Sequence, residues 1–308
     1  MSHIYIYSPS SAVRDKAAFR RGVKRLQTLG HDVEVDADTL SSHMRFAGDD
    51  ATRVAAIGRA AASGANVALI SRGGYGLTRI LKELPYKAIA KSIERGTQFV
   101  GLSDFTALQC AVLAKTGAAT WAGPAVGEDF GVEATPDDIM EACFDDMACG
   151  QGEGTGWTIP LSDQRYLQAR SKSGNLHVKE ATLWGGNLTV LCSMVGTPWM
   201  PDIKNGILFL EDVNEHPYRI ERQLTQLINA GILGKQKAVV LGAFNRYKAS
   251  PHDKGYKLQT VVDWVRTQLK TPVLTGLPFG HVPTKVMLPV GQKVELMVQD
   301  RQALVFWG

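Results

Sequence analysis

The chain has 308 residues, of which 44% are hydrophobic and 21% are charged, and its formal net charge at pH 7 is +4. This composition is typical of a soluble globular protein and argues against a disordered or fibrous chain. The length exceeds the size at which single hydrophobic cores usually stop growing, about 250–300 residues, so we expect two domains.

Charge and hydropathy patterning exclude several classes of partner. Acidic and basic residues are interspersed without a long run of like charge, so no nucleic-acid partner is expected. The apolar start at residues 4–7 is cut off by Ser-Pro-Ser, which makes it too short for a signal peptide, and no stretch approaches the roughly 20 apolar residues of a membrane helix. We therefore expect a cytoplasmic protein that has no membrane partner.

The cysteine and motif content predicts no metal and no other cofactor. The four cysteines lack a C-x-x-C pair, and neither an H-x-x-x-H pair nor a Walker-type Gly-Lys-Ser/Thr loop is present. Cys110 and Cys192 lie in apolar surroundings, so we predict that they pack in the core.

The first half of the chain alternates short apolar strands with helix-like periodicity. Strands are predicted at residues 4–7, 33–35, 67–70, 98–102 and 120–122. This alternation predicts an α/β fold with a mainly parallel sheet, whose ligands bind beyond the carboxyl ends of the strands. We assign residues 1–150 to this first domain.

The second half begins with a glycine-punctuated segment. Residues 151–176 are interpreted as an inter-domain linker, within which residues 157–159 are a candidate short strand. Apolar strands follow at 207–210 and 238–241, helices lie between and after them, and three short strands end the chain. Residues 177–308 are therefore predicted to form a smaller, mixed α/β domain.

Ser103 stands where the apolar run at 98–102 gives way to a helix-like segment at 104–113. A hydroxyl at such a turn lies at the carboxyl edge of the sheet, where the first N–H groups of the helix also point. The turn GLSDF keeps the first Gly and the Ser of the G-x-S-x-G nucleophile elbow but has Phe105 in place of the last Gly. Two interpretations are open: Ser103 attacks a carbonyl, or it only caps the helix.

A serine nucleophile needs a base within reach and a group that orients this base. Of seven histidines, His281 is set apart because it follows a predicted strand and a Gly/Pro-rich turn. Glu211 directly follows the apolar strand at 207–210, where a carboxylate is costly without a partner, and Asp212 and Glu215 are its close rivals. From these positions alone, the favoured interpretation is a surface side chain for His281 and a strand-end carboxylate that reaches solvent for Glu211.

Six motifs in order along nearly the whole chain resemble the LD-carboxypeptidase family, and most of all its bacterial cytoplasmic muramoyltetrapeptide carboxypeptidase branch. They are RGGYG at 72–76, GLSDFTA at 101–107, LWGGNL at 183–188, GTPW at 196–199, LEDVNEHPYR at 210–219 and TGLPFGH at 275–281. Their number and common order make the resemblance specific.

The resemblance implies a serine peptidase in which Ser103 is the nucleophile, His281 the base and Glu211 the carboxylate that orients the imidazole. Its implied reaction releases the terminal D-alanine from murein tetrapeptide, at the bond from the L-centre of meso-diaminopimelate, during peptidoglycan recycling. It further implies a Rossmann-like amino-terminal domain, a smaller α/β carboxyl-terminal domain, an active site at their interface and a homodimer.

Within that mechanism, we assign the oxyanion donors to the backbone N–H groups of Gly73 and Asp104, with Gly74 as a neighbouring candidate. Arg72 is a candidate for binding the carboxylate terminus of the substrate, because guanidinium binds carboxylates in a bidentate way, and an ordinary salt bridge is its alternative role. Trp184 and Asn187 are candidates to line the cleft, although Trp184 equally suits the core.

Two other functions stay open. Relatives of the same fold act as microcin-C-type immunity peptidases, which cleave a peptidyl-nucleotide with the same triad. An added aromatic loop that stacks on a nucleobase would favour that function, and none is identified in the sequence. A non-catalytic murein-peptide-binding protein is the third possibility, which the presence of all three triad residue types disfavours.

Overall fold

The computed structural model describes residues 1–171 and 173–307, which form two compact units. The first unit comprises Met1–Gly152, Thr197–Pro201 and Pro283–Gly291, and the second comprises Glu153–Gly196, Asp202–Val282 and Gln292–Gly308.

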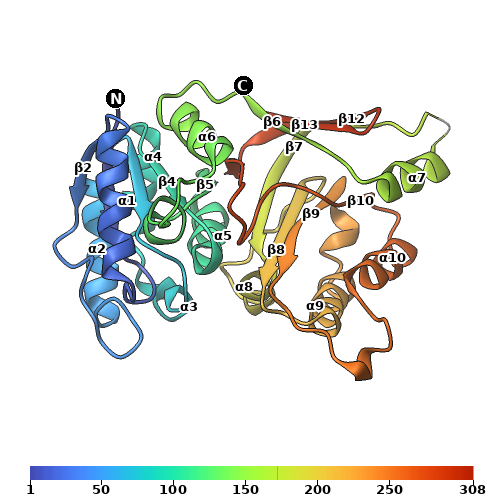
Figure 1. Ribbon diagram of the computed structural model, residues 1–308, viewed down its shortest axis with the longest axis horizontal. Helices are drawn as coiled ribbons and strands as arrows, with labels where there is room; N and C mark the ends of the chain where they lie inside the picture. The colour runs from blue at the N-terminus through green and yellow to red at the C-terminus, as the bar shows by residue number, and fades with distance from the viewer. Residues whose placement is uncertain (172, 308) are drawn as a thin grey trace. The chain divides into compact units, whose positions relative to one another are not determined.

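The first unit is built on one sheet. Its strands are β1 (His3–Tyr7), β2 (Asp32–Val35), β3 (Val67–Ile70), β4 (Gln98–Gly101), β5 (Thr120–Ala122) and β11 (Leu288–Val290). They lie in the order β11-β5-β4-β3-β1-β2. Figure 1 labels β2, β4 and β5 of this sheet. β1 to β5 are parallel, and β11 joins β5 in the antiparallel direction. The central strand β3 is buried along its whole length, as expected for a parallel sheet that is covered on both faces.

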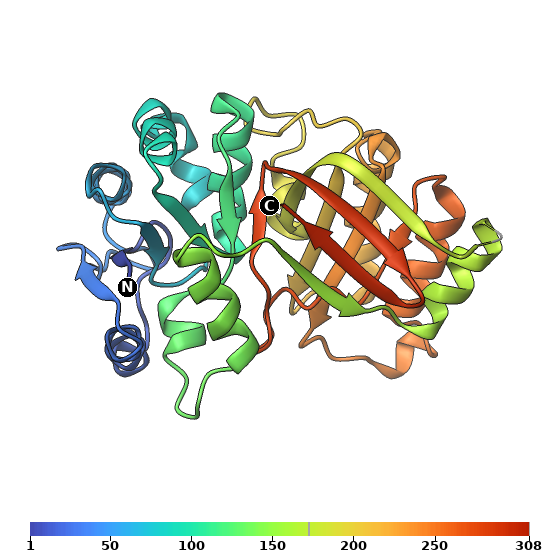
Figure 2. The same cartoon turned by 90° about the horizontal axis from the view of Figure 1, so that it is seen from above.

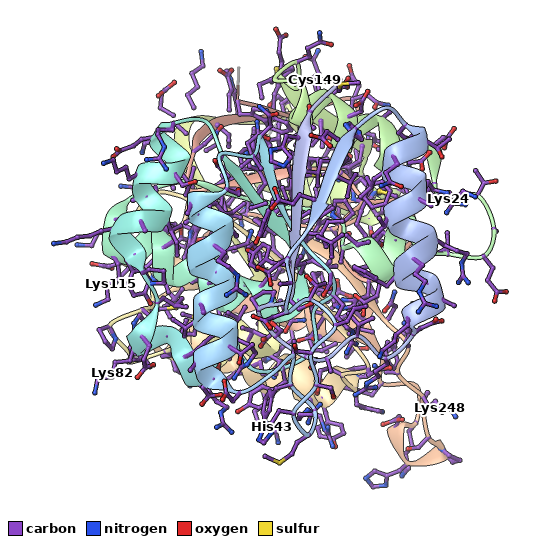
Figure 3. All side chains as sticks on the ribbon, turned by 90° about the vertical axis from the view of Figure 1, so that its left-hand side faces the viewer. Lys24, His43, Lys82, Lys115, Cys149 and Lys248 are labelled. Carbon is purple, nitrogen blue, oxygen red and sulfur yellow. The ribbon has the colours of Figure 1, made fainter. Side chains whose placement is uncertain are left out.

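Helices cover both faces of this sheet, with α1 on one face and α2 and α4 on the other (Figures 2 and 3). The α-helices of the first unit are α1 (Lys16–Thr28), α2 (Asp50–Ala62), α3 (Leu77–Ile80), α4 (Tyr86–Glu94), α5 (Thr106–Thr116) and α6 (Asp138–Ala148). Short 3₁₀ turns η1 (Leu81–Glu83) and η2 (Ser103–Phe105) and a π-turn η3 (Val126–Phe130) complete it. Aspartate side chains cap the first backbone N–H groups of α1, α2 and α6, which explains where these helices begin.

The second unit also has one sheet, in the order β10-β9-β8-β7-β12-β13-β6. Its strands are β6 (Gly154–Thr158), β7 (Leu176–Asn187), β8 (Ile207–Val213), β9 (Ala238–Asn245), β10 (Val273–Leu274), β12 (Lys293–Gln299) and β13 (Gln302–Phe306). β7 to β10 are parallel, whereas β12, β13 and β6 continue the sheet with antiparallel pairing.

The helices of the second unit are α7 (Leu161–Arg170), α8 (Leu188–Ser193), α9 (Pro217–Asn229) and α10 (Leu258–Gln268), with 3₁₀ turns η4 (Leu233–Lys235) and η5 (Pro251–Asp253). α9 buries Ile220, Leu224 and Leu227 along one face, which is the spacing of an amphipathic helix. The predicted α/β class is confirmed in both units. Among the described residues, no helix combines the length and the apolar character that crossing a membrane requires.

The prediction that residues 151–176 form an inter-domain linker is wrong. Most of residues 151–176 fold into the second unit as β6 and α7, because β6 pairs with β13 from Gly154 to Thr158 despite its glycines. The second unit also does not retain all of residues 177–308, since β11 adds to the sheet of the first unit. Pairing between strands that are far apart in sequence decides both boundaries.

The cysteines are free thiols, and burial of Cys110 and Cys192 confirms their predicted core positions. Cys149, just beyond α6, is exposed (Figure 3).

Candidate active site

Ser103 lies on a tight turn directly after β4, in a backbone conformation that is unusual for serine. Its φ is +63°, a left-handed value that costs a non-glycine residue of the order of 1–3 kcal/mol and persists only where surrounding structure enforces it. Gly101 permits the tight packing of this turn, because an added Cβ would lie 2.7 Å from Ile70 Cδ1 and 2.7 Å from Phe105 Cγ. Neither η2 nor α5 has a side-chain cap, so the capping role considered for Ser103 is wrong.

The loop after β3 approaches this turn closely. A Cβ added at Gly73 would lie 2.7 Å from Ser103 Cβ and 3.0 Å from Ser103 Oγ. The next residue, Gly74, has a φ of +111°, and an added Cβ there would lie 2.2 Å from Ser11 Oγ. Only glycine therefore fits at both positions, and the peptide backbone of the loop lies beside the serine hydroxyl.

Two backbone donors lie on these two segments. Within residues 1–171 and 173–307, no hydrogen bond engages the backbone N–H of Gly73 or of Asp104. Backbone N–H groups without an internal acceptor are the usual components of an oxyanion hole.

The Asp104 carboxylate faces the protein interior. It is 1% exposed, and its Oδ2 accepts hydrogen bonds from Ser10 Oγ at 2.7 Å and from the Leu77 backbone N–H at 2.9 Å. Burial, the largest cause, raises the pKa of Asp104, and these two hydrogen bonds oppose that rise.

Arg53 contacts the later end of the loop that follows β3. Its guanidinium is fully buried and donates to the backbone carbonyls of Gly76, at 2.8 Å, and Pro9, at 3.3 Å. It also pairs with Asp50 and lies over the Phe46 ring, 4.8 Å from its centroid. Sequence reasoning missed Arg53, and the available signal was Asp50, an acidic residue three positions earlier, which pairs with it on α2.

Arg72 is already engaged by the protein itself. Its guanidinium donates to Glu128 Oε1 and to the Ala12 carbonyl, each at 3.3 Å. The salt bridge considered as its alternative role is therefore present.

In the second unit, His281 and Glu211 form a direct hydrogen bond of 2.8 Å between Nδ1 and Oε2. Glu211 is fully buried on β8, whereas the His281 side chain is 16% exposed. The turn before His281 requires glycine, because Gly280 has a φ of +131° and an added Cβ would lie 3.0 Å from Glu211 Oε2. Asn245, at the end of β9, donates from Nδ2 to the His281 carbonyl at 2.9 Å.

Asn187 positions the carboxylates beside the histidine. Its Nδ2 donates to Glu211 Oε1 and to Asp212 Oδ1, each at 3.1 Å. Asp212 instead accepts from the backbone N–H and the hydroxyl of Thr189, and burial raises its pKa. Of the three rival carboxylates, Glu211 is the one that contacts His281, whereas Glu215 lies 3.8 Å from Arg219.

Trp184 does not line a binding surface. It is 1% exposed, and its Nε1 donates to Gln236 Oε1 at 3.1 Å. The prediction that it contacts substrate is wrong, because its position in the interior of β7 directs the ring into the core.

The buried ion pair between Lys285 and Asp129 was not predicted from the sequence. Lys285 is 2% exposed and Asp129 is 7% exposed, and Asp129 also accepts from the Ala125 backbone N–H at 2.7 Å. The only sequence signal was a lysine placed directly before an apolar run at 286–288.

The structure thus assembles the predicted residues in two sets. The first unit brings Ser103 together with Gly73, Gly74 and Asp104, and the second brings His281 together with Glu211 and Asn187. The first set offers a hydroxyl beside backbone donors, and the second offers an imidazole oriented by a buried carboxylate. Among the described residues, no group of three or more His, Cys, Asp or Glu side chains is arranged to hold a metal ion.

Two family models match the chain. Residues 4–123 match the LD-carboxypeptidase N-terminal domain, and residues 180–296 match the LD-carboxypeptidase C-terminal domain. A crystal structure of muramoyltetrapeptide carboxypeptidase from Oxalobacter formigenes is 40% identical, has a TM-score of 0.86, and matches over 98% of this chain and 97% of that one.

Two further relatives differ in their described activity. A probable murein peptide carboxypeptidase of Bacillus subtilis is 28% identical over 92% of this chain and 85% of its own length. The microcin C7 self-immunity protein MccF of Escherichia coli is 30% identical over 73% of this chain and 69% of its own length. A solved structure of MccF in complex with glutamyl sulfamoyl guanosine has a TM-score of 0.83 at 25% identity, covering 99% of this chain and 96% of that one.

Proposed function

Since the chain belongs to the LD-carboxypeptidase family, we propose that it releases the terminal D-alanine from murein tetrapeptide with Ser103 as nucleophile. The bond cleaved is the one from the L-centre of meso-diaminopimelate to D-alanine. The hydrogen bond between His281 Nδ1 and Glu211 Oε2 is the observation that carries this proposal, because a serine peptidase needs a base held in one tautomer. Similarity to murein peptide and muramoyltetrapeptide carboxypeptidases supports the substrate class.

The proposed chemistry starts at the imidazole. Because His281 Nδ1 donates to Glu211, the neutral ring has its acceptor on Nε2, which takes the Ser103 hydroxyl proton as Oγ attacks the carbonyl carbon. Glu211 stabilises the resulting imidazolium. The backbone N–H groups of Gly73 and Asp104, with Gly74 as the neighbouring candidate, donate to the oxyanion, and a single donor of this kind is worth about 10²–10³ in rate.

The tetrahedral intermediate then collapses. The carbon–nitrogen bond to D-alanine breaks, His281 returns its proton to the leaving amine, and the acyl group stays on Ser103 Oγ. Water, deprotonated by His281, attacks this ester and regenerates the serine. No residue outside the two sets described above is needed for proton transfer.

Mass spectrometry of murein tetrapeptide incubated with the wild type and with Ser103→Ala tests the proposal. We expect loss of one alanine with the wild type alone, and Ser193→Ala, an exposed serine on α8, is the matched control that keeps activity. Equal cleavage by Ser103→Ala and the wild type would show that Ser103 is not the nucleophile. Comparison of free, anhydro-muramyl-linked and UDP-linked tetrapeptides in the same assay identifies the preferred form.

We further propose a cytoplasmic homodimer that acts in peptidoglycan recycling. Sedimentation at micromolar concentration tests the dimer, and cell fractionation tests the compartment. Accumulation of tetrapeptide in a deletion strain is the expected sign of the recycling role, and restoration by wild type but not by Ser103→Ala would connect it to the active site.

Similarity to the microcin C7 self-immunity protein favours a second candidate, hydrolysis of a peptidyl- or aminoacyl-nucleotide by the same residues. Glutamyl sulfamoyl guanosine, offered in the same mass-spectrometric assay, tests it directly. Cleavage of this compound without cleavage of tetrapeptide would reverse the order of the two candidates. Binding of tetrapeptide without cleavage of either compound would indicate a non-catalytic binding protein.

A further inference from the structure

The buried side chain of Asp104 joins the serine turn to the loop after β3. We propose that this carboxylate is a positioning residue that fixes the relative placement of the two oxyanion donors, the backbone N–H groups of Asp104 and Gly73. This inference rests on the proposed function, in which those two groups face the same oxyanion.

The carboxylate contacts the end of the loop after β3 and the segment after β1. Oδ2 accepts from Leu77 N–H at 2.9 Å, and Leu77 is the first residue of α3, directly after the loop at 72–76. The same oxygen accepts from Ser10 Oγ at 2.7 Å, in the segment after β1. Asp104 is therefore bonded through its side chain to the end of the loop whose other end carries Gly73.

The loop has further supports in its later half. Arg53 donates to the Gly76 carbonyl at 2.8 Å, and the Tyr75 backbone N–H donates to Ser11 Oγ at 2.9 Å. The first half lies against Ser103, where an added Cβ at Gly73 would be 2.7 Å from Ser103 Cβ. The loop is thus fixed at Leu77 by the Asp104 carboxylate and at Gly73 by close packing against Ser103, so a shift of the Leu77 end is transmitted along the loop to the Gly73 N–H.

This arrangement matters because an oxyanion needs both donors within about 2.7–3.1 Å of one point. A buried carboxylate that accepts two hydrogen bonds holds its donors firmly in place, because a donor left without an acceptor in the interior costs free energy. Leu77 N–H and Ser10 Oγ both require an acceptor at this place. Asp104→Asn keeps the size of the side chain but removes its negative charge, which weakens both hydrogen bonds even where the amide oxygen takes the place of Oδ2.

The substrate-independent readout is the rate at which a fluorophosphonate probe labels Ser103, because this reaction also places a developing negative oxygen in the oxyanion hole. We expect Asp104→Asn to lower this rate about ten- to a hundredfold, part of the 10²–10³ that one whole donor supplies. In steady-state assays with tetrapeptide, we expect kcat to fall by a similar factor while KM changes less than about threefold.

Asp36→Asn is the matched control. Asp36 is also a buried carboxylate of the first unit, 3% exposed, and it accepts hydrogen bonds from Tyr5 and Arg59, away from the loop. We expect the thermal unfolding midpoint of Asp36→Asn to fall, while its rate of labelling by the probe equals that of the wild type. If Asp104→Asn behaves in the same way, with a lower midpoint and an unchanged labelling rate, Asp104 is only structural and the inference is overturned.

Ser10→Ala keeps the inference testable if Asp104→Asn does not fold, because it removes one of the two donors and leaves the carboxylate in place. It is expected to lower the labelling rate by a smaller factor, and a rate equal to that of the wild type would contradict the inference. Absence of labelling in the wild type itself would instead refute the proposed function, so the two failures are distinguishable.

Discussion

Gly73 and Ser103 lie so close together that a single added methyl group at residue 73 would sit 2.7 Å from Ser103 Cβ. We therefore expect Gly73→Ala to lower kcat at least about a hundredfold, since either the serine or the oxyanion donor must shift. Overpacking should also cost about 1–3 kcal/mol of stability. Gly58→Ala on α2, where an added Cβ meets nothing within 4 Å, is the control that keeps full activity. Retained activity in Gly73→Ala would exclude Gly73 from the oxyanion hole.

The carboxylate beside His281 is predicted to control its tautomer. Glu211→Gln should lower kcat by about 10³–10⁴, because an amide can present its N–H to the histidine and favour the wrong tautomer. Glu295→Gln, which alters the exposed partner of His177, is the control that should leave kcat unchanged. Near-normal turnover of tetrapeptide by Glu211→Gln would show that His281 needs no orienting carboxylate.

Arg72 is predicted to contribute to recognition of the terminal carboxylate, exchanging its contact with Glu128 for the substrate. Hydrogen bonds to charged groups contribute about 1.5–3 kcal/mol, so Arg72→Gln should raise KM about ten- to a hundredfold with little change in kcat. Glu128→Gln removes the internal competitor and should not raise KM. Tetrapeptide amidated at its C-terminus should be insensitive to Arg72→Gln, and an unchanged KM for the free acid would leave Arg72 with only its salt bridge.

The buried pair Lys285–Asp129 is predicted to stabilise the first unit against loss of either partner. Lys285→Met leaves the Asp129 carboxylate buried without its cation, so the free energy of unfolding should fall by about 3–5 kcal/mol. Lys235→Met, whose lysine lies 3.7 Å from Asp202 at the surface, should change it by less than about 1 kcal/mol. Urea denaturation followed by tryptophan fluorescence measures both, and equal effects would contradict the assignment.

His31 is predicted to make stability depend on pH. It is 6% exposed, and burial lowers its pKa, an effect that nearby Asp145 partly opposes. The unfolded chain then binds the proton more tightly, since its histidine has an ordinary pKa near 6.5. The contribution of His31 is therefore complete above about pH 6.5 and declines as the pH falls towards the lowered native value.

Thermal unfolding of the wild type and of His31→Asn between pH 8 and pH 5.5 measures this dependence. The wild type should lose stability over that interval relative to the variant, in which this contribution is missing. His177→Asn, at an exposed histidine, should keep the wild-type dependence. A parallel decline in the wild type and His31→Asn would show that other groups are responsible.

Much of the fold and part of the site could be predicted from local sequence. The alternation of apolar strands and helical periodicity was sufficient for the α/β class, because that pattern reflects which face of each element is buried. Ser103, Glu211 and His281 were identifiable because each follows a predicted strand and lies in a distinctive motif. The glycines at 73 and 74 were also predictable as places of close backbone approach, since only glycine lacks a Cβ.

Contacts between residues distant in sequence decided the rest. Strand pairing placed β6 in the second unit and β11 in the first, which no local composition indicates. Burial directed Trp184 into the core and matched Lys285 with Asp129, 156 residues away along the chain. The choice of Glu211 over Asp212 as the partner of His281 is of the same kind: both carboxylates accept from Asn187, and only the folded chain brings the turn at 280–281 against Glu211.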